Sequence, residues 1–225
     1  MKQLLLDIKP QPLPTMANFL PGRNAELLDT IMRMLSGVER ERFVYLWGGS
    51  GCGKSHLLQA IVTAYTQKNL KAVYCPAKKH VDFSIESDAD CLAMDDIDTL
   101  GASGQIELFH LYNRFRDEGH GILVLSGAAA PLHLPMRQDL VTRLGWGLVF
   151  QLHELTEAEK LYAMKSRARD CGFDLPDEIC LYLLRHGKRD LPTLIMTVDA
   201  LDQYSLVNQR PITLPLLREL LQVTP

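Results

Sequence analysis

The stretch "YLWGGSGCGKSHLL" (45–58) decides how this sequence is interpreted. Its residues Gly48, Gly53, Lys54 and Ser55 fit the pattern G-x-x-x-x-G-K-[ST], directly after an apolar strand pattern and at the start of a helical one. Glycines in such a turn let successive backbone N–H groups face one anion, and the N-terminus of the following helix adds partial positive charge. The stretch therefore predicts a phosphate-binding loop between a strand and a helix.

Each position of this loop has an expected role in holding a nucleotide. Lys54 is expected to reach the β and γ phosphates, and the Ser55 hydroxyl is expected to ligate Mg²⁺. The expected nucleotide-binding residues are Gly48, Gly49, Ser50, Gly51, Cys52, Gly53, Lys54, Ser55 and His56. The alternative is a glycine-rich turn without a ligand, and the flanking strand and helix patterns favour the binding loop.

A second candidate for metal chemistry is "CLAMDDID" (91–98), an apolar strand pattern that ends in two carboxylates. Ligands of open parallel sheets bind at the carboxyl ends of the strands, so we expect Asp95 to act on Mg²⁺ and Asp96 to orient the attacking water. Two aspartates after a strand are, by themselves, more often part of a turn. The phosphate-binding loop upstream favours the metal site.

Strand and helix patterns alternate through the first two thirds of the chain. Strands are expected at 42–48, 71–76, 91–96, 121–127 and 148–152, and helices at 23–35, 55–67 and 104–119. After the capping box "TEAE" (156–159), whose helix runs to about 169, only helical patterns follow, at 176–186, 192–205 and 213–222. The expected fold class is α/β, a parallel sheet sandwiched by helices and followed by a small all-α lid domain.

The composition narrows the class of protein. The 225 residues are 47% hydrophobic and 23% charged, and the net charge of −3 gives no excess of cations for a phosphate backbone. Direct sequence-specific DNA binding is therefore not expected. The five cysteines are odd in number and lack metal-ligand spacing, which favours reduced thiols. Asp7 and Lys9 interrupt the apolar start, and no apolar run is long enough to span a membrane, so we expect a cytoplasmic protein without membrane contact.

Two further stretches leave alternatives open. The start "MKQLLLDIKPQPLP" (1–14) carries three alternating prolines, which predict an extended segment. In "RLGWG" (143–147), Arg143 is either a solvated residue at a helix end or an arginine finger delivered to the nucleotide of a neighbouring subunit. Trp146 is expected to anchor the turn into the last strand.

Taken together, these motifs resemble the AAA+ ATPases, and more narrowly the ATPase domain of the bacterial replication initiator DnaA. The stretches that carry the resemblance are "NFLPGRNAELL" (18–28), "GGSGCGKSHLLQAI" (48–61), "FHLYNR" (109–114) and "TRLGWGL" (142–148). The last of them resembles the arginine-finger box of the initiators. The resemblance therefore implies that Arg143 acts on a nucleotide in trans.

Three differences from an initiator point to its relatives, the Hda-type regulatory inactivators. The chain stops at Pro225, which leaves no room for a helix-turn-helix domain that reads duplex DNA. Residues 77–90 are too short and acidic for the helical pair that grips single strands in initiators. The start is a short peptide rather than a helicase-recruiting domain. These differences favour an ATPase core without DNA-binding parts.

The resemblance to the inactivators assigns a role to the first residues. Gln3, Leu4, Leu6 and Ile8 match the peptide that docks on the DNA polymerase sliding clamp (beta subunit) in that family, whereas an unstructured terminus is the alternative. The implied domains are a clamp-binding peptide and linker (1–17), a nucleotide-binding domain (18–154) and a helical lid (155–225).

The same resemblance implies that the chain is a negative regulator of replication initiation. It would bind ADP or ATP with Mg²⁺, dock on the clamp and present Arg143 to ATP held by DnaA. Self-association into a homo-oligomer is a further alternative. Its own ATP hydrolysis is expected to be weak or absent for two reasons. Pro192 stands where the family has its lid arginine, and Lys188 or Arg189 would have to substitute for that arginine. In addition, only Ser126 offers a polar sensor residue after the fourth strand. The alternatives are a DnaA-like or helicase-loader ATPase at the origin, and a self-contained P-loop ATPase.

Overall fold

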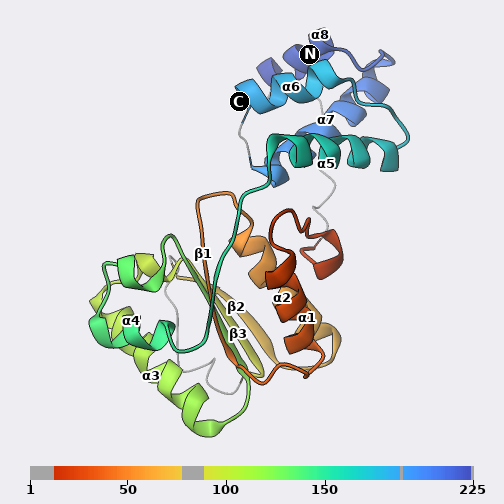
Figure 1. The fold of residues 1–225 in the computed structure, drawn as a ribbon. Coiled ribbons are helices and arrows are strands. Elements are labelled where there is room, and N and C mark those ends of the chain that lie inside the picture. Colours follow the sequence, from red (N-terminus) through yellow and green to blue (C-terminus); the bar gives the residue numbers. More distant parts are fainter. Residues whose placement is uncertain (1–12, 78–88, 188–189, 224–225) are drawn as a thin grey trace. The chain divides into compact units, whose positions relative to one another are not determined.

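The computed structural model of the chain describes residues 13–77, 89–187 and 190–223. Two compact units are present, one formed by residues 13–154 and the other by the residues from 155 onward (Figure 1). Within the described ranges, no helix is long and apolar enough to cross a membrane.

The first unit is built on a five-stranded parallel sheet. Its strands are β1 (Phe43–Trp47), β2 (Ala72–Pro76), β3 (Cys91–Asp95), β4 (Ile122–Gly127) and β5 (Leu148–Gln151), in the order β2-β3-β4-β1-β5. The register pairs Trp47 with Gly127 and Pro76 with Asp95, so these strand ends lie along one edge of the sheet. The loop that follows β1 therefore starts at the edge where β3 and β4 also end.

Helices cover both faces of this sheet (Figure 1). α1 (Ala25–Leu35) and α2 (Lys54–Gln67) pack on one face, and α3 (Ala102–Glu118) and α4 (Gln138–Leu144) pack on the other. Alternating side chains of β1 point to opposite faces, as in any strand. Val44 and Leu46 join the core with α1 and α2, whereas Tyr45 joins the core with α3 and α4. Both faces are thus buried, as the apolar strand patterns predict.

The second unit contains four helices in its described residues. They are α5 (Glu157–Asp170), α6 (Asp177–His186), α7 (Leu191–Asn208) and α8 (Leu214–Val223), and they share one apolar core. The expected capping box of α5 is confirmed, since the Glu159 N–H donates to the Thr156 hydroxyl and the Thr156 N–H donates to the Glu159 carboxylate. Arg167 of α5 donates two hydrogen bonds, at 2.7 and 3.0 Å, to Asp199 of α7.

The expected fold class is confirmed, and every expected strand and helix is present with small shifts at its ends. The largest shift is at the end of α7, which reaches Asn208 where 205 was expected. Three short 3-10 turns, η1 (Met16–Asn18), η2 (Ile97–Thr99) and η3 (Pro131–His133), had not been expected, and the helix α4 was expected only in the interpretation that placed Arg143 at a helix end. α4 has seven residues, too few for a helical period to stand out in the sequence.

Candidate functional site

The loop between β1 and α2 takes a conformation that depends on its glycines. Gly51 and Gly53 have φ angles of +78° and +105°, which residues with a side chain rarely adopt. A Cβ atom on Gly48 would lie 2.5 Å from the carbonyl oxygen of Leu152, just beyond β5, whereas a Cβ on Gly49 would meet no atom within 4 Å. The backbone of this loop is therefore free to face a phosphate closely, which fits the predicted cradle.

Lys54 opens α2 and is buried within the same loop. Its ammonium donates to the carbonyl oxygens of Gly48 at 2.8 Å and Gly49 at 3.0 Å. Gly53, the N-cap of α2, has no side chain that could accept from the first N–H groups of the helix. These N–H groups and the ammonium together make the loop electropositive, so an anion is its natural ligand.

His56, expected to contact nucleotide, is engaged with the segment that precedes α1. Its Nε2 lies 2.9 Å from Asn18 Oδ1, an oxygen that also accepts from the Thr15 N–H, so Nε2 must be the donor. The imidazole also lies against the ring of Phe19, with centroids 5.7 Å apart. Burial lowers the pKa of His56, with the backbone of Thr15 acting in the opposite direction. His56 thus attaches this segment to the P-loop helix as a neutral imidazole.

Cys52 lies inside the loop as a buried thiol. Burial raises its pKa, and the nearby Lys54 opposes this shift only in part. A thiol with a raised pKa is a poor nucleophile at neutral pH. Cys52 therefore contributes its backbone and its small size to the loop rather than thiolate chemistry.

Asp95 ends β3 with its carboxylate buried and hydrogen-bonded. The Tyr74 hydroxyl donates to Oδ2 at 2.8 Å, and the Ser126 hydroxyl donates to Oδ1. Asp96, by contrast, adopts the left-handed conformation with φ +54°, and its N–H donates to Ser126 Oγ at 3.1 Å. Ser126, which the sequence suggested only as a polar sensor, therefore forms hydrogen bonds with both aspartates.

Tyr74 is a site residue that the sequence did not reveal. Burial and then the hydrogen bond to Asp95 raise its pKa to about 12, while the side chains of Gln59 and Ser55 act in the opposite direction. The Tyr74 hydroxyl is thus held by the β3 carboxylate, near enough to the loop serine for that side chain to affect the pKa of Tyr74. The signal was available in part, because β2 pairs with β3 and Tyr74 lies two residues before the end of β2.

A further carboxylate approaches the end of β4 from η2. Asp98 Oδ1 accepts from the Ala128 N–H at 3.1 Å, and the Tyr45 hydroxyl donates to the Ala129 carbonyl at 2.7 Å. Burial and then Asp98 raise the pKa of Tyr45 well above its usual range, so Tyr45 stays a neutral donor. The segment after β4 has no acidic residue of its own, but Asp98 supplies a carboxylate there.

The metal-binding residues expected from sequence do not form a complete ion site by themselves. In the part of the chain that the structure describes, no group of three or more His, Cys, Asp or Glu is arranged to hold a metal ion. Mg²⁺ in nucleotide sites is held by one or two protein ligands together with phosphate oxygens and water. Ser55 and Asp95, which both influence the pKa of Tyr74, fit such a partial set of ligands.

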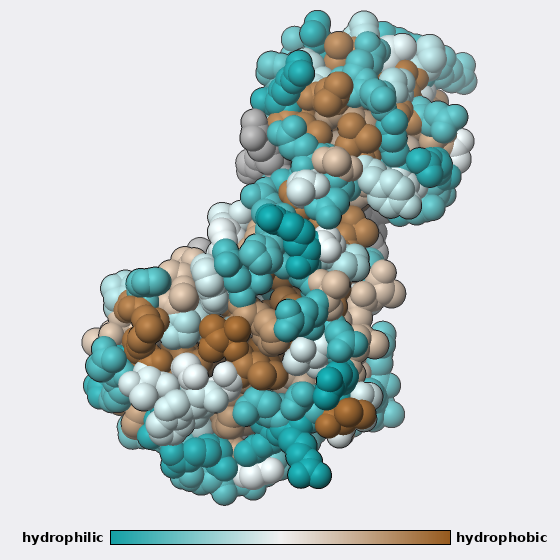
Figure 2. All heavy atoms as spheres, viewed as in Figure 1, coloured by the Kyte–Doolittle hydropathy of each residue, from teal (hydrophilic) through white to brown (hydrophobic). Residues whose placement is uncertain are grey.

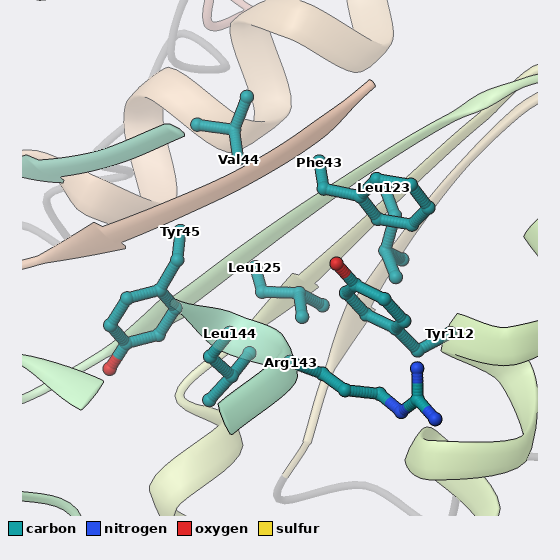
Figure 3. A pocket seen from close by; sticks show the side chains of 8 residues that line it. All are labelled: Phe43, Val44, Tyr45, Tyr112, Leu123, Leu125, Arg143 and Leu144. Carbon is teal, nitrogen blue, oxygen red and sulfur yellow. The ribbon is translucent and has the colours of Figure 1, made fainter. Parts of the chain in front are cut away.

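Arg143 lies in the last turn of α4, covered by aromatic rings. Its guanidinium carbon is 4.6 Å from the centre of the Phe109 ring, 4.9 Å from that of Trp146 and 5.8 Å from that of Tyr112. Figure 3 shows the side chain extended from α4, with the guanidinium beside Tyr112. Burial, and then Glu41, raise the pKa of Tyr112 to about 12, so this ring is a neutral phenol. The guanidinium is thus not simply solvated, as one of the two interpretations had it.

A small pocket lies beside Arg143, between β1, β4 and the two helices on that face (Figure 3). It is lined by Phe43, Val44, Tyr45, Tyr112, Leu123, Leu125, Arg143 and Leu144. Apart from the guanidinium and two phenol hydroxyls, this lining is apolar.

Trp146 was expected to anchor the turn into β5, and this expectation is wrong. Its side chain is 57% exposed and covers Arg143 instead of packing into the core. The anchor of this turn is Gly147, because a Cβ there would lie 2.3 Å from the Phe43 carbonyl oxygen. Phe43 begins β1, whereas the phosphate-binding loop follows the end of β1. Arg143 and the loop therefore lie toward opposite ends of that strand.

Comparison with known proteins identifies the family. The model of the bacterial DnaA ATPase domain matches residues 11–151. The chain belongs to the bacterial DnaA ATPase-domain family. A second family model, described as Hda, lid domain, matches residues 157–221. The resemblance inferred from the sequence motifs is thereby confirmed.

Solved structures show the same AAA+ fold. Domain III of the Thermotoga maritima replication initiation protein DnaA is 24% identical, with a TM-score of 0.76 over 95% of this chain and 100% of that one. AMPPCP-bound DnaA from Aquifex aeolicus is 20% identical, with a TM-score of 0.70 over 90% of this chain and 71% of that one. The Thermotoga maritima RuvB Holliday junction branch migration motor is 17% identical, with a TM-score of 0.70 over 93% and 72%.

The Hda-type lid of this DnaA-family protein has a proline where a lid arginine was expected. Pro192 is the second residue of α7, after the N-cap Asp190, whose side chain accepts from the Thr193 N–H at 2.9 Å. The suggested substitutes Lys188 and Arg189 lie outside the described residues. So do the residues expected to bind the clamp, which are Gln3, Leu4, Leu6 and Ile8.

Proposed function

We propose that this DnaA-family AAA+ protein is a negative regulator of replication initiation. It binds ADP or ATP, docks on the DNA polymerase sliding clamp and promotes hydrolysis of DnaA-bound ATP by presenting Arg143 in trans. The observation that carries the proposal is the position of Arg143 toward the end of β1 opposite to the chain's own phosphate-binding loop. A guanidinium directed away from its own loop is suited to the nucleotide of a neighbouring subunit.

In this proposal the loop residues hold the chain's own nucleotide. The backbone of residues 48–53 cradles the phosphates, Lys54 exchanges its two carbonyl partners for phosphate oxygens, and Ser55 and Asp95 act on Mg²⁺. The metal, when bound, neutralises phosphate charge and fixes the phosphate geometry. Asp96 would orient water, but Pro192 brings no charge to the lid position, so the chain's own turnover is slow.

The role of Arg143 is electrostatic. In phosphoryl transfer, charge spreads over the oxygens of the transferred group, and a guanidinium from a neighbouring subunit stabilises that charge. DnaA is the proposed recipient because the chain is itself a DnaA-family domain and carries an Hda-type lid. Self-association of this chain is a second arrangement in which the same face would be used.

Clamp docking is proposed from the sequence pattern of Gln3, Leu4, Leu6 and Ile8. The net charge of −3 supports recruitment through a protein partner rather than through the DNA backbone. The double substitution Gln3→Ala and Leu6→Ala should abolish retention of the protein on immobilised clamp. Retention equal to that of the wild type would exclude this peptide as the anchor.

The test of the proposal is ATP hydrolysis by DnaA with and without this protein and DNA-loaded clamp. The Arg143→Ala variant should fold and bind nucleotide but lose the stimulation, because an arginine finger accelerates hydrolysis by roughly 10³–10⁵-fold where it operates. Arg116→Ala is the matched control, since Arg116 is a partly exposed arginine on α3 that pairs with the neighbouring Asp117. Full stimulation by Arg143→Ala would contradict the finger assignment.

A self-contained ATPase is the second candidate, favoured by the buried and hydrogen-bonded Asp95 next to a complete phosphate-binding loop. It predicts steady ATP turnover by the isolated protein that Lys54→Ala abolishes and Arg143→Ala leaves unchanged. The trans-acting function predicts little ATP turnover by the isolated protein, and it predicts that Arg143→Ala abolishes the stimulation of ATP hydrolysis by DnaA.

A further inference from the structure

The guanidinium of Arg143 is held by ring faces rather than by acceptors. Throughout the described ranges it has no ion pair and no hydrogen bond, and its Nε and Nη1 atoms are buried without a partner. A guanidinium carries five N–H donors, one on Nε and two on each terminal nitrogen. Three of the five donors therefore lie on the two buried atoms. An arginine in its final working position would have these donors satisfied.

The buried atoms also determine what Arg143 can bind from this position. Arginine recognises phosphate through pairs of neighbouring N–H groups, either across Nη1 and Nη2 or along an edge that includes Nε. Every such pair includes Nε or Nη1, unless Nη2 acts by itself. With both atoms covered, Arg143 cannot make a bidentate contact with a phosphate from a neighbouring subunit. The side chain must move before it can act.

The three rings around the guanidinium differ in how firmly they are held. Tyr112 is buried, and its ring stacks on Phe43 with centroids 4.3 Å apart. Phe109 is half-buried on the same helix, one turn earlier. Trp146 is 57% exposed, in a turn between two glycines. The seat of Arg143 thus has a fixed wall, Tyr112, and an accessible cover, Trp146.

We propose that Phe109, Tyr112 and Trp146 form an aromatic clasp that holds Arg143 in a retracted position, and that contact of a partner subunit with the Trp146 side releases it. This inference rests on the proposed function of Arg143 as a finger in trans. The three aromatic residues are positioning residues, since they act through Arg143 and not on the nucleotide. Cation–π attraction holds the guanidinium against the rings in the retracted position. After release, charge-assisted hydrogen bonds to a phosphate take the place of these ring contacts.

The apolar surroundings support a protein partner for this face. Ile106 on α3 and Leu132 on η3 are exposed by 41% and 84%, on elements that pack with α4 or precede it. Figure 2 shows apolar residues, in brown, interspersed with hydrophilic residues on the visible face of the 13–154 unit. A neighbouring AAA+ subunit that brings a nucleotide to Arg143 would provide both the apolar contact and the phosphate acceptor.

The retracted position is tested without any partner by the reaction of arginine with phenylglyoxal. The full-length folded protein is labelled, and the masses of its peptides then show how fast each arginine has reacted. The reagent needs the guanidinium nitrogens, so Arg143 should react at least about tenfold more slowly than the exposed Arg114 on α3. Trp146→Leu should raise the reaction rate of Arg143 several-fold. Trp146→Phe, which keeps a ring, and Tyr162→Leu, which removes an exposed ring from the other unit, should leave it slow.

Equal reaction of Arg143 and Arg114 in the wild type would overturn the clasp, and so would an Arg143 rate that Trp146→Leu does not change. Thermal unfolding of each variant separates loss of the clasp from loss of the fold. Trp146 is exposed, so Trp146→Leu should unfold near the wild-type temperature.

The release step is tested by DnaA ATP hydrolysis measured over a range of concentrations of each variant. Trp146→Leu should lower the concentration that gives half-maximal stimulation about two- to fivefold, because the partner no longer has to displace Arg143 from the clasp. An unchanged or higher half-maximal concentration would overturn release and would mean that the rings present the finger instead. If the wild type gives no stimulation at all, the proposed function fails and release with it, while phenylglyoxal still decides whether Arg143 is clasped.

Discussion

Lys54 and Arg143 are basic residues set against the same five-stranded sheet, but their surroundings differ. Lys54 donates to two carbonyl oxygens, and nearby Asp95 accepts from two hydroxyls. Arg143 meets ring faces, and two of its nitrogens lack a partner among the described residues. A buried charge with its partners in place stabilises the resting fold, whereas one without them indicates that its acceptor comes from outside. The polar groups of the nucleotide loop are therefore satisfied by the chain itself, whereas Arg143 needs an acceptor from another chain.

The largest expected effect is that of Lys54→Ala on nucleotide binding. Loss of the ammonium should weaken ADP binding roughly 100-fold or more, because charge-assisted bonds to phosphate are lost. Isothermal titration with ADP measures this, with Lys68→Ala at the end of α2 as the matched control. If the two regions are independent, phenylglyoxal protection of Arg143 stays at its wild-type level in Lys54→Ala. Unchanged affinity for ADP would remove Lys54 from the site.

An intermediate effect should separate satisfied from unsatisfied polar groups. Tyr74→Phe leaves a buried carboxylate oxygen of Asp95 without its donor and should lower the free energy of unfolding by about 1–3 kcal/mol. Arg143→Met removes unpaired donors together with the ring contacts, so its free energy of unfolding should change by less than about 0.5 kcal/mol. Urea unfolding measures both. A larger loss in Arg143→Met than in Tyr74→Phe would reverse the comparison.

The smallest expected effect is a pH dependence that comes from His56. Because burial lowers its pKa in the folded protein, the unfolded chain binds a proton there more readily. The contribution of the neutral imidazole is complete above the unfolded pKa of about 6.5 and declines as the pH falls below that value. Comparing urea midpoints at pH 7.5 and pH 5.5, wild type should lose more stability than His56→Gln. Parallel losses would show that other groups are responsible.

Much of the fold could be predicted from local patterns. The strand before Gly48, the helix after Gly53 and the capping box at Thr156 depend on residues close in sequence, so the sequence specified them directly. The helix α4 is short, and its apolar residues pack on α3 and the sheet. Its formation depends on contacts that no local pattern contains.

The candidate site was predicted only as far as its motifs extend along the chain. Asp95 and Ser55 were found by their motifs, but Tyr74, which donates to Asp95, belongs to no motif. Asp98 was not singled out because its partner, Ala128, is 30 residues away. Trp146 was misassigned because a tryptophan in a turn is usually buried. Its contact with Arg143 is local, but only the packing of α3 against α4 brings the rings of Phe109 and Tyr112 to the same guanidinium.

The sequence by itself thus determined the phosphate-binding loop, the acidic end of β3, the alternation of strands and helices and the separate helical lid. These features follow from backbone conformation and from the spacing of apolar residues, which act over a few positions. The tertiary structure decided which buried polar groups have partners: Asp95 receives Tyr74 and Ser126, whereas Arg143 receives only rings. Partners of buried charges come from elements distant in sequence, so only the packed sheet and helices determine them.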